Sequence, residues 1–269
     1  FFLWVHFMDL HFPYHPAPKY IGIPRWKIRN IDLSILREAV KKDDLSEIRS
    51  LYEASMRGLD ENLGRLFDYL KDKKLMDSTA IVITSDHGEE FLEHGDFGHG
   101  PKLCDELLHV PLIIFANGLL KQSRVQELVG QTVVAPTMLS IVNLPKPSVF
   151  LGKDLLTAIE DRSEARVISE CSHTSRSCYV DLKYLQYAVR TERHKFIFHP
   201  NRGRCELYDL RKDLHELNNV AGENPEIVEK YRALVDGHMR FEIQTVKYHY
   251  KSVSSVDALS DRLRALGYA

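Results

Sequence analysis

The chain has 269 residues, of which 44% are hydrophobic and 28% charged, and its formal net charge is −2. This length is enough for one large domain and a small one, and the composition is that of a globular protein with a sizeable core. The near-neutral charge gives no reason to expect nucleic acid or a membrane surface as a partner, and no run of about 18 or more apolar residues predicts a membrane span.

The chain begins with an apolar run, Phe1-Phe2-Leu3-Trp4-Val5, which predicts a buried strand over residues 1–9. A strand of a parallel sheet needs neighbours on both sides, so we expect the chain to be the carboxyl-terminal part of a longer protein. A proline-rich loop follows the strand. Asp9 and His11 stand at alternate positions where the strand ends, so both side chains can face the same way.

Apolar residues recur at steps of three and four from Leu45 to Leu70, which predicts a long amphipathic helix. The β-branched run at 79–84 predicts a buried strand directly after it, so strand, helix and strand are laid out as a parallel crossover unit. Residues 110–115 predict a further strand with Pro111 near its start. Ala135-Pro136-Thr137 opens a short helix.

The pattern changes near Arg166. Short strands predicted at 167–168, 185–189, 195–198 and 206–208 indicate an antiparallel sheet, followed by a helix near 224–243 and a helical tail over 254–266. We therefore expect an α/β fold. Residues 1–155 would form part of a mixed sheet flanked by helices, and residues 156–269 a smaller antiparallel-sheet subdomain with terminal helices.

The strongest chemical signal is the triplet Asp86-His87-Gly88, which stands where the predicted 79–84 strand ends. Ligands of open α/β sheets bind just beyond such strand ends. A carboxylate and an imidazole side by side can both turn onto one divalent cation, and the pair suits calcium, manganese or zinc. The alternative is a capping aspartate beside a surface histidine. Two ligands do not fill a coordination sphere, so others must come from elsewhere in the fold.

Three further side chains are candidates for the same site. His99 lies between two glycines, which let the backbone approach a ligand closely, and it could hold an anionic group against the metal. Lys102 could serve the same purpose, although such a lysine is more often solvated. His11 could act as a general acid toward a leaving oxygen if its strand neighbours the 79–84 strand. The alternative for each histidine is a structural residue of a loop.

A weaker signal comes from the acidic residues that follow the triplet, Glu89, Glu90 and Glu93, and from His94. A helical turn that carries charges is usually a solvated face, so we expect no direct part in chemistry for these carboxylates. His94 is kept as a possible supporting group or zinc ligand.

These residues together resemble the sulfatase family within the alkaline-phosphatase superfamily. The resemblance rests, in chain order, on Ile83–Glu89 (ITSDHGE), His94-Gly95, Gly98-His99-Gly100 and His109–Ile113 (HVPLI). Further similar segments are Trp4–Tyr14, which resembles the family's entry into the active site, Ala135–Leu139, and Glu206–Leu210 with Asp213, Glu216 and Asn218. The similarity covers almost the whole chain.

The resemblance implies hydrolysis of a sulfate ester, usually with calcium. Asp86 and His87 would be metal ligands, and His11 would contact the sulfate or protonate the leaving alcohol. His99 stands where many relatives place a sulfate-binding lysine. The family's nucleophile is a formylglycine made in a Cys/Ser-x-Pro/Ala-x-Arg motif, and no segment of this sequence has that motif. We expect the motif, with paired metal-binding aspartates, to precede Phe1, and we expect these 269 residues alone to be inactive.

Two alternatives stay open. The same scaffold hosts phosphodiesterases, phosphonate hydrolases and phosphoryl transferases, which change the nucleophile and keep a His-Asp metal pocket. The chain could also be a non-catalytic module that binds a divalent ion or a sulfated ligand. The expected partner in the main interpretation is a small-molecule or glycan sulfate ester. The sequence indicates neither the compartment nor the oligomeric state.

Overall fold

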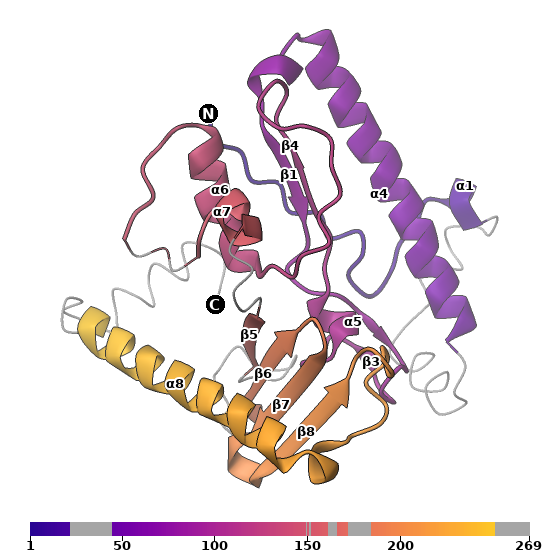
Figure 1. Ribbon diagram of the computed structural model, residues 1–269. Helices are drawn as coiled ribbons and strands as arrows, with labels where there is room; N and C mark the ends of the chain where they lie inside the picture. Colours follow the sequence, from indigo (N-terminus) through magenta and orange to yellow (C-terminus); the bar gives the residue numbers. More distant parts are fainter. Residues whose placement is uncertain (22–44, 149, 151, 161–165, 172–183, 251–269) are drawn as a thin grey trace. The chain divides into compact units, whose positions relative to one another are not determined.

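The computed structural model describes residues 1–21, 45–148, 150, 152–160, 166–171 and 184–250, which are the coloured parts of Figure 1. They form two compact units. The first holds Phe1–His99 and Glu106–Ser123, and the second holds Gly100–Asp105 and Arg124–Ala269. The domain boundary expected between residues 155 and 156 falls inside the second unit and stays a prediction.

The first unit contains the long helix α4 (Ser46–Asp72), which confirms the helix predicted from Leu45 to Leu70. Strand β1 (Ile81–Thr84) follows α4 and the 3-10 helix η1 (Met76–Ser78), and it pairs with β4 (Leu112–Phe115). The other elements are α1 (Pro18–Ile21), β2 (Glu90–Phe91), β3 (Phe97–Gly98) and α5 (Asp105–Leu108), whose first residue belongs to the second unit.

Two expectations about this unit are wrong. Residues 1–8 form no strand, and Phe1 and Trp4 are 98% and 78% exposed. An apolar run becomes a strand only where a neighbouring strand accepts and donates its backbone hydrogen bonds, and no described strand pairs with this segment. Strand β1 runs antiparallel to β4, with Ile81 opposite Phe115, so the described residues form no parallel crossover.

The core of the first unit joins the β2–β3 hairpin to α4. Tyr14, Leu45, Ile48 and Leu51 are buried, and partly buried rings pack against them: Phe12, Tyr52, Phe91 and Phe97. Neighbouring rings meet edge to face, with centroids 5.3 Å apart for Tyr14 and Tyr52. Edge-to-face packing is the favoured geometry for aromatic pairs, so this cluster fixes the hairpin on the helix.

The second unit contains one antiparallel sheet in the order β5-β6-β7-β8, which confirms the predicted carboxyl-terminal sheet. Its strands are β5 (Arg166–Cys171), β6 (Gln186–Thr191), β7 (His194–His199) and β8 (Arg204–Asp209). The described residues of the unit also form three 3-10 helices and two short helices: η2 (Gln131–Val133), α6 (Val134–Ile141), α7 (Leu155–Glu160), η5 (Pro200–Arg202) and η6 (Ala221–Glu223).

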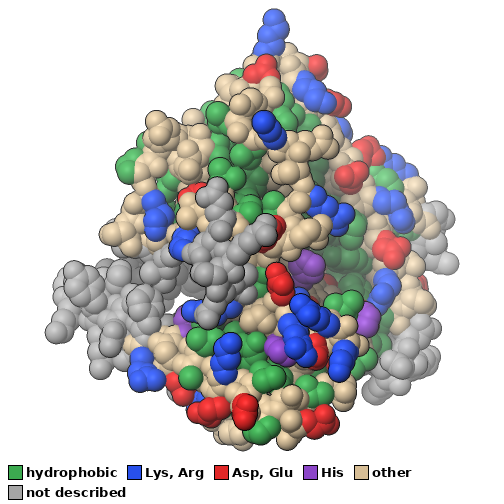
Figure 2. Space-filling view, viewed as in Figure 1, with side chains coloured by type: hydrophobic (Ala, Val, Ile, Leu, Met, Phe, Trp, Pro, Cys, Tyr) green, Lys and Arg blue, Asp and Glu red, His purple; other side chains and the backbone are tan. Residues whose placement is uncertain are grey.

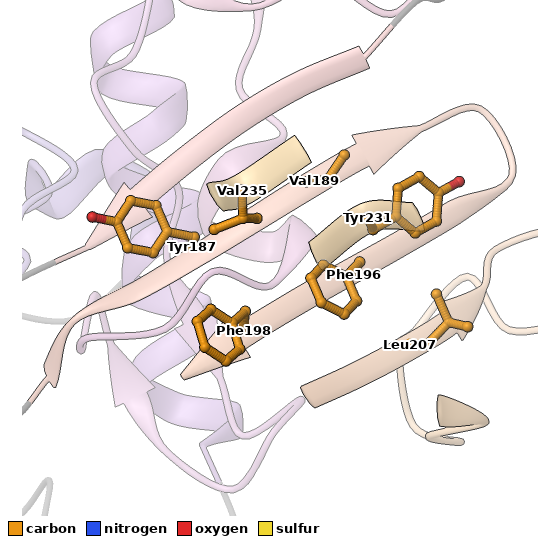
Figure 3. Packing of buried hydrophobic residues seen from close by; sticks show 7 residues of the cluster. All are labelled: Tyr187, Val189, Phe196, Phe198, Leu207, Tyr231 and Val235. Atoms are coloured by element: carbon orange, nitrogen blue, oxygen red, sulfur yellow. The ribbon is translucent and has the colours of Figure 1, made fainter. Parts of the chain in front are cut away.

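Helix α8 (Pro225–Tyr250) covers one face of this sheet, as predicted for the helix near 224–243 (Figure 1). Figure 3 shows side chains from three strands and from α8 turned toward one another: Tyr187, Val189, Phe196, Phe198, Leu207, Tyr231 and Val235. All seven are at most 5% exposed, which makes this cluster the main stabilising core of the unit. The helical tail predicted over 254–266 lies outside the described residues.

The opposite face of the sheet is polar, because successive strand residues point to opposite faces. Residues that alternate with the core positions on β6, β7 and β8 place polar side chains there: Gln186, Arg190, Lys195, His199, Arg204, Glu206 and Tyr208. Several of them are buried, Lys195 completely. A buried cation must be paired, so this face has to bind anionic groups of the unit.

On the visible face of the molecule, acidic and basic side chains are interspersed, without a large patch of one sign (Figure 2). Among the described residues, no helix combines the length and apolar character that a membrane span needs.

The Glu206 carboxylate on the polar face of the sheet accepts several hydrogen bonds whose contribution to stability can be measured. His199 Nε2 lies 2.9 Å from its Oε1, and the Tyr208 hydroxyl donates to Oε2 at 2.5 Å. Burial opposes ionisation, but hydrogen bonds from His199, Tyr208 and Arg204 hold the pKa of Glu206 at about 2. A carboxyl whose folded pKa is depressed adds stability above its unfolded pKa, and this stability is lost as the pH falls through the folded value.

We therefore expect Glu206→Gln to lower the free energy of unfolding at neutral pH by on the order of 1–2 kcal/mol, and to lower it progressively less between about pH 4.5 and pH 2. Urea unfolding followed by circular dichroism at several pH values measures this difference. Glu192→Gln, at an exposed glutamate in the turn between β6 and β7, is the matched control. A pH-independent difference between Glu206→Gln and the wild type would contradict the assignment.

Candidate active site

The loop after β1 is held by a close backbone contact. The Gly88 N–H donates to the Leu107 carbonyl at 2.8 Å, and a Cβ at Gly88 would lie 1.9 Å from the Glu106 carbonyl oxygen. Only glycine allows this approach. The Ser85 hydroxyl also donates to the His87 carbonyl at 2.6 Å. The loop therefore has one tight conformation, which sets the positions of Asp86 and His87.

Asp86 and His87 are suited to hold one cation. Asp86 Oδ1 accepts the His87 N–H at 3.1 Å, and Asp86 Oδ2 lies 3.8 Å from His87 Nε2. His87 Nδ1 lies 2.8 Å from the Gly88 carbonyl oxygen. A carbonyl only accepts, so Nδ1 carries the proton and Nε2 keeps a lone pair. One carboxylate oxygen and one imidazole nitrogen thus lie within the span of a single coordination shell, and both side chains are substantially exposed.

His99 is oriented by a buried carboxylate. Its Nδ1 lies 3.0 Å from Glu89 Oε1, and the Glu89 side chain is 6% exposed. The Tyr14 hydroxyl donates to Glu89 Oε2 at 2.9 Å. The hydrogen bond to Glu89 raises the pKa of His99, and the charges of Glu89 and Asp86 add to this effect, although burial lowers the pKa. The carboxylate stabilises the proton on Nδ1 and directs Nε2 away from itself.

The backbone before His99 depends on Gly98, which has a φ of +90° in the region that favours glycine. Gly98 pairs with Glu90 across the β2–β3 hairpin. The hairpin therefore ends in a left-handed residue that turns the chain into His99, in agreement with the flanking glycine noted in the sequence.

Three histidines that are far apart in the sequence lie together in the first unit. The rings of His87 and His99 are stacked, with centroids 4.2 Å apart and planes inclined by 29°. The His11 ring lies 5.3 Å from that of His99, and its Nδ1 is 2.6 Å from the Phe12 carbonyl oxygen. The structure thus brings together Asp86, His87, His99 and His11, which the sequence had proposed for one site. Lys102 belongs to the second unit, and its part in this site stays a prediction.

The acidic residues after the triplet do not form a solvated helical turn, contrary to the expectation. Glu90 is fully buried, and its Oε1 accepts the backbone N–H groups of His94 at 3.1 Å and of Asp96 at 2.9 Å. The segment is therefore a hairpin organised around this carboxylate. The sequence did not indicate that Glu89 and Tyr14 orient His99, because residues 14 and 89 come together only in the folded chain. The His94 ring pairs with Glu106 Oε1.

Comparison with known proteins gives two family models that match the chain. The model of the sulfatase family matches residues 1–144. A second family model, described as N-sulphoglucosamine sulphohydrolase, C-terminal, matches residues 92–240. The two matches overlap over residues 92–144, and together they include residues of both units.

The curated relatives that match the chain include proteins named as sulfatases. The chain is 31% identical over 196 residues to arylsulfatase K of Gallus gallus, which covers 70% of this chain and 36% of that protein. It is 30% identical over 179 residues to N-acetylglucosamine-6-O-sulfatase of Bacteroides thetaiotaomicron, covering 64% of this chain and 32% of that protein. The chain thus spans about a third of the length of these two relatives.

Solved structures show the fold. A putative sulfatase from Bacteroides thetaiotaomicron superposes with a TM-score of 0.62 at 23% identity, covering 77% of this chain and 44% of that one. A protein solved with its substrate D-glucosamine-2-N,6-O-disulfate has a TM-score of 0.58 at 26% identity, covering 87% and 50%. The phosphonate monoester hydrolase of Agrobacterium radiobacter has a TM-score of 0.59 at 26% identity, covering 72% and 41%. The expected α/β, alkaline-phosphatase-like fold class is confirmed.

The backbone contact of Gly88 leads to a direct test. We expect Gly88→Ala to reduce the free energy of unfolding by about 1–3 kcal/mol, because the added methyl group forces the Glu106–Leu107 backbone away from the loop. Gly64→Ala is the matched control, since a Cβ at residue 64 would meet nothing within 4 Å and alanine favours helix α4. Urea unfolding of the three proteins measures the difference. Equal stability of Gly88→Ala and the wild type would show that the loop is not held this way.

Proposed function

The chain belongs to the sulfatase family, and on that premise we propose that it carries part of the active site of an enzyme that hydrolyses a sulfate monoester. The observation that carries the proposal is the convergence of Asp86 and His87 with His99 and His11 in one unit. The chain spans only part of its relatives, so the activity concerns the full-length protein.

Asp86 and His87 are the proposed metal ligands, with calcium as the proposed ion and manganese or zinc as alternatives. The support is the lone pair on His87 Nε2 and the neighbouring carboxylate oxygen 3.8 Å away. When bound, a divalent cation would neutralise charge on the sulfate oxygens. Further ligands have to come from residues beyond this pair, because calcium takes roughly six to eight ligands, predominantly oxygen atoms.

His99 is proposed to bind the sulfate through Nε2. Its Nδ1 is engaged by Glu89, so Nε2 is the ring atom that can donate to a sulfate oxygen when the ring is charged. The proton on His99 would be stabilised in turn by the buried Glu89 carboxylate and by the Tyr14 hydroxyl behind it. The hydrogen bond from Nδ1 to Glu89 holds the His99 ring in one orientation, so its Nε2 would present a positive charge to the anion at a defined position.

His11 is proposed as the general acid that protonates the leaving alcohol. Its Nδ1 contacts the Phe12 carbonyl, so Nε2 is the atom that would hold or transfer the proton. The nucleophile is proposed to be a formylglycine supplied by a part of the protein outside these 269 residues, since their sequence has no Cys/Ser-x-Pro/Ala-x-Arg motif. We accordingly propose that the 269 residues alone do not turn over substrate.

The proposed substrate class is a sulfated glycan. Two similar proteins support this choice: one is named N-acetylglucosamine-6-O-sulfatase, and another was solved with D-glucosamine-2-N,6-O-disulfate as its substrate. A second candidate activity is hydrolysis of a phosphonate or phosphate ester, which the likeness to a phosphonate monoester hydrolase at 26% identity favours. A metal pocket with histidine donors suits both kinds of tetrahedral anion.

The test uses the full-length protein with p-nitrophenyl sulfate, p-nitrophenyl phosphate, phenylphosphonate esters and N-acetylglucosamine 6-sulfate as substrates. We expect the sulfate esters to give the highest kcat/KM, and His11→Asn to lower kcat about 100-fold or more, the usual contribution of a general acid. His15→Asn, at an exposed histidine four residues away, is the matched control and should leave kcat within twofold of the wild type.

Asp86→Asn should also reduce the affinity for calcium in isothermal titration, because one charged ligand is lost. Preference for phosphonate esters would replace the sulfatase proposal by the second candidate. Unchanged kcat in His11→Asn would remove His11 from catalysis, and turnover by the 269 residues alone would overturn the proposed need for an external nucleophile.

A further inference from the structure

Residues 11–14 of the first unit are connected to both histidines that are proposed to act on the sulfate ester. At one end of this segment, His11 Nδ1 lies 2.6 Å from the Phe12 carbonyl oxygen. At the other end, the Tyr14 hydroxyl donates to Glu89 Oε2 at 2.9 Å, and Glu89 Oε1 lies 3.0 Å from His99 Nδ1. The ring centroids of His11 and His99 are 5.3 Å apart. One short stretch of chain therefore carries the first histidine and, through Glu89, orients the second.

Tyr14 has a fixed position in the core of the unit. Its side chain is 1% exposed, and Ile48 and Leu51 of α4 belong to the same buried cluster. The Tyr52 ring meets the Tyr14 ring edge to face with centroids 5.3 Å apart, and the Phe12 ring does so at 5.6 Å. A ring that is packed in this way keeps one rotamer, so its hydroxyl oxygen stays at one point relative to α4.

The Glu89 carboxylate depends on the Tyr14 hydroxyl. Burial and the neighbouring Glu89 charge raise the pKa of Tyr14, so the phenol keeps its proton at neutral pH and acts as a donor. The Glu89 side chain is 6% exposed, so its oxygens need donors from the protein. Tyr14 holds Oε2 and His99 holds Oε1. Without the hydroxyl, Oε2 would lose this donor and the carboxylate would be free to turn away from His99.

The separation of the two histidine rings matters for the proposed chemistry. The sulfur atom of a sulfate ester carries both the oxygens that His99 would bind and the leaving oxygen that His11 would protonate. The two imidazoles must therefore keep a constant separation, because a small misplacement of either one reduces the rate steeply. The contact of Glu89 with Tyr14 makes the position of His99 depend on the segment that bears His11.

We propose that Tyr14 is a positioning residue of the active site, which through Glu89 holds the His99 ring at a constant separation from His11. The inference rests on the proposed function, since it assigns His99 to the sulfate and His11 to the leaving oxygen. Helix α4 contributes to the site in the same way, because its residues Ile48 and Leu51 pack in the cluster that fixes Tyr14.

The first test is a double-mutant cycle in the full-length protein with p-nitrophenyl sulfate, whose leaving group needs little help from a general acid. Tyr14→Phe keeps the ring and removes the hydroxyl. It should lower kcat/KM roughly tenfold, mainly through KM, because the His99 ring loses its fixed orientation. In a His99→Ala background, Tyr14→Phe should change kcat/KM by less than about twofold, because the residue that Tyr14 positions is gone. An equal loss in both backgrounds would overturn the proposal.

Tyr52→Phe is the matched control. It removes a hydroxyl from the same aromatic cluster, whereas the hydrogen bond to Glu89 comes from Tyr14, so it should leave kcat/KM within about twofold of the wild type. A loss as large as that in Tyr14→Phe would assign the effect to packing of the cluster and overturn the role of the Tyr14 hydroxyl. If Tyr14→Phe does not fold, Glu89→Gln replaces it in the cycle with the same expected losses, because an amide offers one acceptor oxygen where the carboxylate offers two.

The second test does not depend on activity. Proton NMR of the full-length protein with isotopically labelled histidine detects a ring N–H that a buried carboxylate protects from exchange with water. The Nδ1–H resonance of His99, assigned by its loss in His99→Ala, should be present in the wild type and in Tyr52→Phe, and it should broaden beyond detection in Tyr14→Phe. Its absence from the wild type, or its persistence unchanged in Tyr14→Phe, would overturn the proposed link. If the wild-type protein hydrolyses no sulfate ester, the proposed function fails, and the resonance still decides whether Tyr14 holds the His99 ring.

Discussion

The close approach of Gly88 to the Glu106–Leu107 backbone is the constraint on which the candidate site depends. Strand β1 delivers the chain to this point, and the contact leaves no room for a side chain at residue 88. The two residues before it therefore have fixed backbone positions, and the carbonyl of Gly88 in turn selects the tautomer of His87. A single tight loop thus positions both proposed metal ligands, and its Gly88 carbonyl leaves Nε2 as the ring nitrogen of His87 that is available to a metal.

Buried carboxylates hold the segments that lie next to that loop. Glu90 accepts two backbone N–H groups of its own hairpin, and Glu89 connects Tyr14 with His99. A buried charge is costly unless donors surround it, so each of these acids specifies one local conformation of the chain. The site is built from loops and a hairpin of two-residue strands, and charge-assisted hydrogen bonds stabilise these segments in place of long strand ladders.

The sequence predicted the helices and strands whose pattern lies within a few neighbouring residues. Its predictions were wrong or incomplete where a segment depends on contacts with residues far away in the chain. The periodicity from Leu45 to Leu70 and the four short strands after Arg166 were enough to predict α4 and the carboxyl-terminal sheet. The run at Phe1 was wrongly assigned as a strand, because apolar composition does not supply a hydrogen-bonding neighbour. Asp86, His87, His99 and His11 were named together, but the contacts that orient them were not predictable. The Tyr14 hydroxyl reaches Glu89 because the aromatic cluster packs Tyr14 against α4 and the hairpin.

The chain passes from the first unit to the second directly after His99. His99 belongs to the first unit, the next six residues belong to the second, and Glu106 returns to the first. The segment between them is held by Gln186 at one end and by the ion pairs of Asp105 with Arg190 and Lys195 at the other, whose positions are set by the register of β6 and β7. A shift of that register by one residue would turn Lys195 to the face covered by α8 and leave Asp105 without its cations. The apolar core under α8 therefore maintains the register of β6 and β7 that holds the segment Gly100–Asp105.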